Sequence, residues 1–283
     1  MAGNTPLDSL LPAEMAEKAE SIGTKKARLD AASTFTLAVL AGAFIALGGV
    51  FATTVWTGDG MQFGLARLLG GVAFSLGLIL VIVGGAELFT GNNLIVMAWA
   101  AGKIRVSDLI RNWAIVYFGN LVGAVGTAVL VFLAQQHTLG NGAVGVKALA
   151  IAEAKCSLGF VPALFLGILC NALVCLAVWM TFSARTTTDR VLAILPPITA
   201  FVAVGFEHCI ANMYFIPVAI LIKAFAPATY WEQIGRQPTD FASIDAAGLW
   251  NNLLPVTLGN IIGGCVLVGA VYWFVYLRPR RNS

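Results

Sequence analysis

Long apolar stretches separated by short polar segments form the main pattern along this chain of 283 residues. Six stretches are long enough to cross the roughly 30 Å hydrocarbon layer of a membrane, which takes about 20 helical residues. They cover residues 35–56, 68–101, 113–134, 156–184, 191–222 and 253–277. We therefore expect an all-α membrane protein whose six-helix transmembrane domain spans residues 35–277.

Two of the six stretches are interrupted by similar polar sequences. GAELFTGN at 85–92 breaks the second stretch, GFEHCIAN at 205–212 breaks the fifth, and both contain Gly-x-Glu-x-x-x-x-Asn. Membrane helices broken in corresponding places of two halves are typical of transport sites at a repeat interface. The pattern predicts a channel or transporter whose second and fifth spans are broken.

A second pair of motifs divides the chain into halves. GNLVG at 119–123 lies in the third span and GNIIG at 259–263 lies in the sixth. Repeat 1 then covers residues 35–134 and repeat 2 covers 156–277. Because each half has three spans, the second half must cross the membrane in the opposite direction to the first. We expect an inverted 3+3 repeat.

Composition agrees with a membrane protein and indicates its orientation. Hydrophobic residues make up 59% of the chain and charged residues 11%, and the mean hydropathy is +0.85, whereas soluble domains are about 25% charged. Twelve of the 17 lysines and arginines fall on the side of the N-terminus, so both termini are expected in the cytoplasm. This bias accounts for the net charge of +3, and no nucleic-acid partner is expected. These twelve are Lys18, Lys25, Lys26, Arg28, Lys103, Arg105, Arg111, Arg185, Arg190, Arg278, Arg280 and Arg281.

Residues 1–34 are predicted to form a cytoplasmic amphipathic segment, and residues 278–283 a cytoplasmic tail. Apolar residues recur at helical spacing in the first of these, and the helix is expected either to anchor at the membrane surface or to act as a gate over the pore. These residues are Leu7, Leu11, Met15, Ala19 and Ile22.

The five cysteines are odd in number and show no paired metal-binding spacing. We interpret them as apolar packing residues and expect neither a metal site nor a cofactor. They are Cys156, Cys170, Cys175, Cys209 and Cys265.

His208 is the only histidine within a span, and it lies in the interruption of the fifth. An imidazole can take up or release a proton at physiological pH. A buried histidine can also simply bond a freed backbone carbonyl, but this position favours a functional role. Thr90 lies in the matching first-half loop, where its hydroxyl can bond the imidazole or a carboxylate, or cap the following helix.

Glu87 and Glu207 occupy corresponding positions of the two interruptions. We expect them to accept hydrogen bonds from backbone N–H groups freed by the breaks, because a bare negative charge on a pore wall would repel an anion. Asn92 and Asn212, also a matched pair, suit helix N-caps.

Two further polar residues are candidates for contact with a permeant. Asn171 lies in the middle of the fourth span. Lys155 precedes that span on the predicted periplasmic side, where an ammonium group would either attract anions to the mouth or simply snorkel at a helix end.

Several segments together resemble the formate/nitrite transporter family, and within it the formate channels. The resemblance implies an aquaporin-like fold, a homopentamer with one pore in each protomer, and His208 as the central pore histidine. It also supports pore roles for Asn171 and Lys155. The segments are FGLARLLGG and FSLGLIL within 63–80, GAELFTG, VYFGNLVGA, LGILCNALVCLAVWM at 166–180, GFEHCIANMYFIP at 205–217, PVTLGNIIGG at 255–264 and the N-terminal TPLDSLLPAEMAEKAE.

The same resemblance implies apolar constrictions on either side of the histidine. By residue type alone, each of these side chains would be assigned to helix packing. They are Phe74, Leu78, Leu88, Phe89, Val174 and Phe201.

We therefore expect a channel or transporter of the cytoplasmic (inner) membrane that moves formate, alone or with a proton as formic acid. Protonating formate at neutral pH costs about 4 kcal/mol, whereas carrying the bare carboxylate through an apolar constriction costs several to tens of kcal/mol. In this hypothesis Lys155 attracts the anion, Thr90 and His208 bind it, and His208 can donate a proton.

Nitrite and hydrosulfide channels of the same family are the alternatives. An enzyme is not expected, because the sequence lacks H-E-x-x-H and G-x-S-x-G motifs. The expected partners are a small monovalent anion, a proton, membrane lipid and further copies of the chain.

Overall fold

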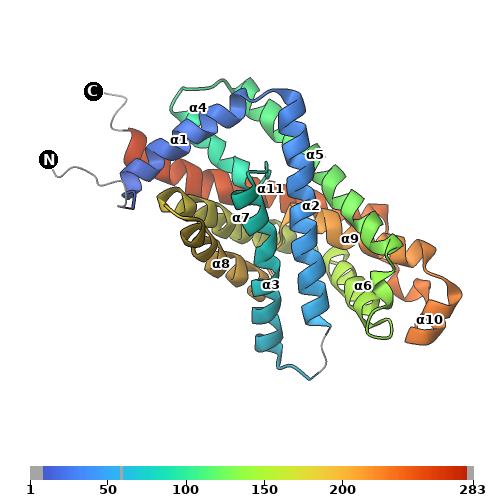
Figure 1. The fold of residues 1–283 in the computed structure, drawn as a ribbon. Helices are drawn as coiled ribbons and strands as arrows, with labels where there is room; N and C mark the ends of the chain where they lie inside the picture. The colour runs from blue at the N-terminus through green and yellow to red at the C-terminus, as the bar shows by residue number, and fades with distance from the viewer. Residues whose placement is uncertain (1–8, 58–59, 279–283) are drawn as a thin grey trace.

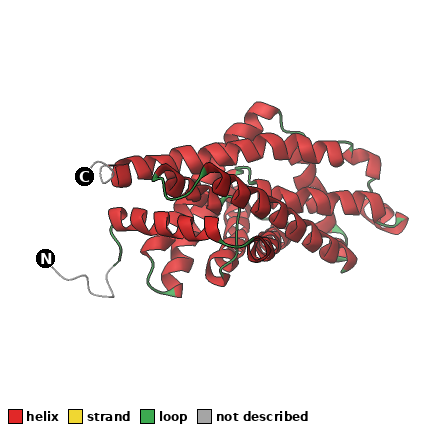
Figure 2. Cartoon of the chain, turned by 90° about the horizontal axis from the view of Figure 1, so that it is seen from above, coloured by secondary structure: helices red, strands yellow, loops and turns green. Residues whose placement is uncertain are grey.

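The computed structural model describes residues 9–57 and 60–278, and within these residues it contains helices and loops but no strand. Six helices are long and apolar enough to cross a membrane, which confirms the all-α, six-span prediction. Leu7, Arg280 and Arg281 lie outside the described residues. Figures 1 and 2 show that the helices pack into one bundle, in which α3 of the first half lies against α8 of the second, and α2 and α5 lie against α9.

The first half begins with a helix on the surface of the bundle and continues with three spans. The second of these is broken, and only short helical segments follow the break. The elements are α1 (Pro12–Arg28), α2 (Ala31–Trp56), α3 (Phe63–Gly84), η1 (Gly91–Ile95), α4 (Val96–Ala100) and α5 (Val106–Leu133).

The second half repeats this order, including a helix before its first span. Its broken span continues as a full helix, α9, and its last helix, α11, runs on with the wider π-helical geometry. The elements are η2 (Gln136–Thr138), α6 (Ala143–Cys156), α7 (Phe160–Ser183), α8 (Thr187–Val204), α9 (Cys209–Phe225), α10 (Ala228–Ile234), η3 (Pro238–Phe241), α11 (Ala246–Ile261), η4 (Ile262–Ala270) and η5 (Trp273–Leu277).

The breaks occur where the sequence predicts them. α3 ends at Gly85 (φ 76°) and α8 ends at Gly205 (φ 83°), both left-handed conformations that glycine adopts without strain. Other glycines allow close helix packing: a methyl group at Gly42 would overlap the backbone of Asn120, and one at Gly263 would overlap that of Ile168.

Two features of the fold were not predicted from the sequence. The fourth span begins at Phe160, and the residues before it form α6, a helix that was not expected. α1 packs on the protein, with Met15, Ala19 and Gly23 buried and Gly23 against Ile95 and Ala98. One face of α1 therefore contacts the protein, and its role as an anchor or a gate stays a prediction.

The two described ends of the chain lie on the same side of the bundle. Met15 of α1 and Leu277 of η5 belong to one buried cluster, together with Trp179 and Phe182 at the end of α7. This arrangement is the one that six spans require when the chain starts and finishes on one side of a membrane.

Candidate functional site

Two cavities follow one another along α3. The first has a volume of about 480 Å³ and is lined by the N-terminal part of α3 together with α6, the end of α8 and the start of α9. The second has a volume of about 300 Å³ and is lined by α1, the C-terminal part of α3 and the loop after it. We call them the α6 cavity and the α1 cavity. The two cavities therefore lie at successive levels of one spanning helix.

His208 lines the α6 cavity and meets Thr90, which lines neither cavity. Both are buried, with 3% and 0% of their surface exposed, and His208 Nε2 lies 3.0 Å from Thr90 Oγ1. The two residues come from the interruptions of different halves, 118 positions apart. The structure therefore brings together the two residues that the sequence analysis places in matching loops.

The backbone fixes which nitrogen of His208 carries the proton. His208 is the N-cap of α9, and its Nδ1 accepts a hydrogen bond of 3.1 Å from the Ala211 N–H. Nδ1 is therefore unprotonated, and the hydrogen of the neutral ring is on Nε2, which donates to Thr90 Oγ1. The Thr90 hydroxyl hydrogen then points elsewhere, and Thr90 makes no capping bond of its own.

Apolar side chains flank this polar pair on both sides. On the side of the α6 cavity, the Phe74 and Phe201 rings meet edge to face at 5.8 Å, and Phe201 stacks on His208 at 5.9 Å. On the other side, Leu78 and Leu88 line the α1 cavity. All four are at most 3% exposed, so buried apolar side chains lie on both sides of the pair.

Phe89 and Val174 were also expected at the constrictions, but neither lines a cavity. The Phe89 ring packs edge to face against Tyr117 at 5.0 Å and Trp113 at 6.1 Å. Val174 is 1% exposed in the same core cluster. Both share this cluster with the other four residues expected at the constrictions, and their own place at a constriction stays a prediction.

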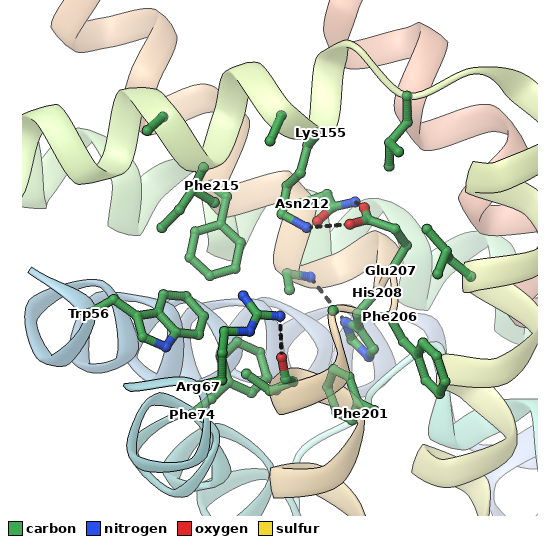
Figure 3. Close-up of a pocket in the computed structure, with 18 of the residues that line it drawn as sticks. Trp56, Arg67, Phe74, Lys155, Phe201, Phe206, Glu207, His208, Asn212 and Phe215 are labelled. Carbon is green, nitrogen blue, oxygen red and sulfur yellow. Dashed lines mark hydrogen bonds and ion pairs between the residues drawn. The ribbon is translucent and has the colours of Figure 1, made fainter. Parts of the chain in front are cut away.

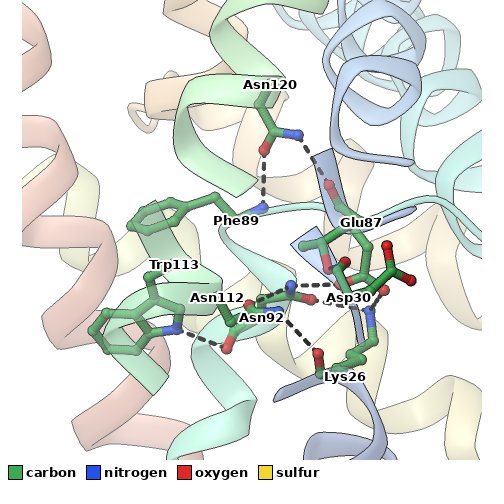
Figure 4. Close-up of polar contacts among 9 residues, drawn as sticks. Lys26, Asp30, Glu87, Phe89, Asn92, Asn112, Trp113 and Asn120 are labelled. Carbon is green, nitrogen blue, oxygen red and sulfur yellow. Dashed lines mark hydrogen bonds and ion pairs between the residues drawn. The ribbon is translucent and has the colours of Figure 1, made fainter. Parts of the chain in front are cut away.

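A lysine and two asparagines surround Glu87 beside the α1 cavity, as Figure 4 shows. Lys26 Nζ lies 2.7 Å from Glu87 Oε1 and donates to Asn92 Oδ1 at 3.0 Å. The Asn92 amide donates to Glu87 Oε2 at 2.7 Å and to Asn112 Oδ1 at 3.0 Å. Lys26 comes from α1, so the N-terminal helix supplies the cation of this first-half network.

The second half builds the same network beside the α6 cavity, part of which is visible in Figure 3. Lys155 Nζ lies 2.8 Å from Glu207 Oε1, and the Asn212 amide donates at 2.6 Å to both Glu207 Oε2 and Asn252 Oδ1. α6 thus corresponds to α1, and each repeat begins with its own helix rather than with its first span.

These contacts correct the roles expected for four loop residues. The carboxylates of Glu87 and Glu207 accept from lysine and asparagine side chains, not from freed backbone N–H groups. Asn92 and Asn212 bond the glutamates and cap no helix, since His208 itself caps α9. A buried carboxylate is costly unless a cation and hydrogen-bond donors surround it. The lysine and asparagine side chains supply both.

Asn120 and Asn260 bond the backbone groups that the helix breaks leave free. In the sequence they stand out only as part of the repeated GN motifs. Asn120 donates to the carbonyls of Ala38 and Glu87 and accepts from the Phe89 N–H. Asn260 donates to the carbonyls of Gly167 and Glu207 and accepts from the Cys209 N–H. Their matching positions in the two halves are the sequence signal that could have identified this role.

Asn171 bonds three segments around the Thr90 loop. Its amide donates to the carbonyl of Asn260 at 2.6 Å, to Asn93 Oδ1 at 3.0 Å and to the Thr90 carbonyl at 3.3 Å. It is fully buried and lines neither cavity. These bonds hold the Thr90 loop, and contact of Asn171 with a permeant stays a prediction.

Lys155 lines the α6 cavity, but it is not a free cation. Only 15% of its side chain is exposed, its ammonium pairs with Glu207, and it lies 5.6 Å from the centre of the Phe215 ring. Snorkelling at a helix end is therefore excluded as its arrangement. Its positive charge reaches an anion in the cavity only together with the negative charge of Glu207.

Arg67 was missed by the sequence analysis, which counted it only for orientation. Its guanidinium donates to the carbonyls of Val202 and Ala203 at 2.7 and 2.8 Å (Figure 3). These are among the last carbonyls of α8, where a cation is favourable. Arg67 thus ties α3 to the end of α8, next to Phe201.

All five cysteines are buried and unpaired, and the part of the chain that the structure describes holds no cluster of His, Cys, Asp and Glu suited to a metal ion.

Comparison with known proteins gives one consistent result. The family model for formate/nitrite transporters matches residues 13–274. The formate channel FocA of Escherichia coli (strain K12) is 48% identical over the whole of both chains, and FocA of Haemophilus influenzae is 43% identical over 92% of this chain and 93% of its own. The solved structure of a pentameric formate channel with formate bound is 49% identical and has a TM-score of 0.83, over 87% of this chain and 98% of that one.

Proposed function

Because this chain belongs to the formate/nitrite transporter family, we propose that it is a formate channel of the cytoplasmic membrane. The family and the similar relatives are channels or transporters, which indicates a transport protein and not an enzyme. Nitrite and hydrosulfide, the alternative substrates, are less well supported because the relatives with the higher identities are formate channels. The similar pentameric structure supports a pentamer with one path through each protomer.

The observation that carries the mechanism is the buried His208–Thr90 pair in an apolar segment beside the α6 cavity. A small planar carboxylate that reaches this segment meets the Thr90 hydroxyl and the imidazole, and it must then pass Leu78 and Leu88 or Phe74 and Phe201. A bare anion is costly among such side chains, while the neutral acid is not. Formic acid is therefore the species that crosses.

Proton donation by His208 has a structural condition. The neutral ring, with its hydrogen on Nε2, can only share that hydrogen, so donation of a proton requires the ring to be protonated on Nδ1 first. A protonated Nδ1 cannot accept from the Ala211 N–H, and α9 would lose its cap. The proton-donating form thus comes with an adjustment of the first turn of α9, next to Phe201.

A lysine–glutamate pair at each end of the path sets the local charge. Lys155 and Lys26 draw formate into the α6 and α1 cavities, and the paired glutamates keep each cavity from holding the anion too tightly. We place the α1 cavity and both termini on the cytoplasmic side, following the distribution of lysine and arginine.

The test is uptake of labelled formate and labelled nitrite into proteoliposomes between about pH 5 and pH 8. Three proteins are compared: the natural chain, His208→Phe, and His137→Phe as the matched control. His137, the other histidine, is buried outside the path between the Phe132 and Tyr230 rings, where a phenyl ring fits. We expect acid-stimulated formate uptake in the natural chain and the control.

In His208→Phe the acid stimulation should be lost, while slow anion leakage remains. Unchanged stimulation in His208→Phe would overturn the role of the imidazole. A preference for nitrite would assign the chain to the nitrite branch of the family.

A further inference from the structure

A basic pocket lies at the end of the bundle where α1 finishes and α5 begins. It has a volume of about 660 Å³ and is formed by the end of α1, the loop before α5 and the first turns of α5. Its charged lining residues are Arg28, Lys103, Arg105, Asp108 and Arg111. Neither the cavities nor the path between them includes any of these residues.

Many N–H donors of the arginines in this pocket make no hydrogen bond within the part of the chain that the structure describes. Arg28 and Arg111 each donate one hydrogen bond, to the backbone carbonyls of Lys103 and Leu29 at 3.5 and 3.2 Å. A guanidinium has five N–H donors, and neither of these two arginines pairs with a carboxylate in the part of the chain that the structure describes.

The two carboxylates near the pocket do not balance its charge. Asp108 contacts the Arg105 side chain at 3.4 Å, and Glu20 lies 3.7 Å from Lys103 Nζ. The Arg105 and Lys103 side chains are 84% and 55% exposed, so these pairs are weak. Four cations against two carboxylates leave a positive pocket with donors available to an anion.

The surroundings of the pocket are those of a membrane surface. The apolar span α2 starts at Ala31 and α5 starts at Val106, directly after the pocket residues of α1 and the loop. Val106 and Ile110 are 56% and 54% exposed, and Trp99 is 45% exposed. Exposed apolar side chains and a tryptophan beside basic residues are typical of the interface between lipid headgroups and hydrocarbon.

We propose that this pocket binds the phosphate headgroup of an anionic phospholipid. The arginines and Lys103 bond the phosphate oxygens, and the acyl chains lie along the exposed apolar residues of α5. A soluble anion would use the charges but would gain nothing from Val106, Ile110 and Trp99. The combination of charge and exposed apolar surface therefore selects a lipid.

The bound lipid would also act on the α1 cavity. Arg28 and Lys26 both lie in the last turn of α1, and Lys26 pairs with Glu87. A headgroup that holds Arg28 fixes this turn and with it the cation of the first-half network. Formate uptake should therefore depend on the anionic lipid content of the vesicle.

The experiment is a titration of the detergent-solubilised oligomer with phosphatidylglycerol, followed by native mass spectrometry, with phosphatidylcholine of the same chains as reference. The pocket variant is Lys103→Gln/Arg111→Gln. The matched control is Lys25→Gln/Arg236→Gln, which removes two exposed cations that do not line the pocket. A third arm adds inorganic phosphate as a competitor.

We expect saturable binding of phosphatidylglycerol and affinity about 30-fold lower in the pocket variant, since each basic residue near an anionic headgroup contributes about a factor of five. The control variant should bind like the natural chain. Equal weakening in both variants would mean that general surface charge is responsible, and equally tight binding of phosphatidylcholine would mean that the charges are irrelevant. Phosphate that displaces the lipid at similar concentration would identify a soluble anion as the ligand. Each of these three results overturns the proposal.

If the pocket variant does not form the oligomer, a second measurement tests the proposal. The natural chain is reconstituted in phosphatidylcholine with increasing phosphatidylglycerol, and formate uptake per protein is measured. Uptake that does not change with anionic lipid content, together with no bound phosphatidylglycerol on the natural chain, also overturns the proposal.

Discussion

The two interrupted spans have the same supports and different chemistry. In each, a glutamate pairs with a lysine from the helix before the repeat, and two asparagines complete the bonding around it. The residue after the glutamate, however, is Leu88 in the first loop and His208 in the second. Two positions later the residues are Thr90 and Ile210.

This difference shows how a duplicated scaffold can hold an asymmetric site. The repeated residues fold each loop and bury its carboxylate, and they need the same geometry in both halves. Between the halves, the histidine of one loop meets the threonine of the other at 3.0 Å. Repeated residues should therefore affect stability in either half, whereas the unmatched residues should affect transport.

The networks also differ in one detail. Lys26 bonds both Glu87 and Asn92, but Asn212 Oδ1 has no partner among the described residues. Asn252 instead adds a second bond to Glu207, at 3.3 Å. The second network thus contains a buried acceptor without a hydrogen bond within the described part of the chain. In the first network, the lysine side chain is more exposed.

The largest effect is expected for Asn120→Leu and Asn260→Leu. Each change leaves two buried backbone groups of the broken loop without a partner, a carbonyl and an N–H, and each such group costs about 1–3 kcal/mol. Both variants should lose the folded oligomer in detergent, judged by size-exclusion chromatography, while Asn251→Leu, an exposed position, should not. A tolerated change in one half alone would contradict the symmetry of the scaffold.

The next effect is expected for Lys155→Met and Lys26→Met. Removing one partner of a buried ion pair costs about 3–5 kcal/mol, and Lys26→Met should cost less because that side chain is 30% exposed against 15% for Lys155. The apparent melting temperature of the oligomer gives the ranking. Lys155→Met/Glu207→Gln should recover most of the loss, and failure to recover would mean that Lys155 acts through other contacts.

The smallest effect on stability is expected for Thr90→Val, which removes the acceptor of the His208 Nε2–H and costs about 1–3 kcal/mol. Formate uptake at acidic pH should fall far more than the melting temperature, and Thr90→Ser should restore it. Ile210→Val, at the corresponding buried position of the second loop, serves as the control. Equal loss of uptake in Ile210→Val would show that the threonine position is not special.

Much of the fold follows from the sequence because membrane spans are read from local pattern. Length and hydropathy predict the six spans, and the repeated Gly-x-Glu-x-x-x-x-Asn sequences predict both breaks. α6 was missed because its 14 residues are too short for a span and lie between two longer apolar stretches. The same pattern could not show that α1 packs into the bundle, since an amphipathic helix suits a lipid surface as well as a protein surface.

The site was predicted less completely because its contacts join distant segments. His208 and Thr90 were found from their loops, but the partners of Glu87 and Glu207 lie 61 and 52 residues away. One signal was available. Lys26 and Lys155 each stand five residues before the first span of their half, at Ala31 and Phe160.

The place of Lys26 also has a practical meaning for anyone who shortens or tags this protein. α1 resembles a removable extension because it precedes the first span, yet its last turn supplies the counter-charge of a glutamate in the bundle interior. A deletion that stops before α1 trims an end, whereas one that passes Lys26 removes an interior part. The longer deletion also leaves Glu87 without its cation. A loss of transport in that protein therefore says nothing about gating unless Glu87 is neutralised as well.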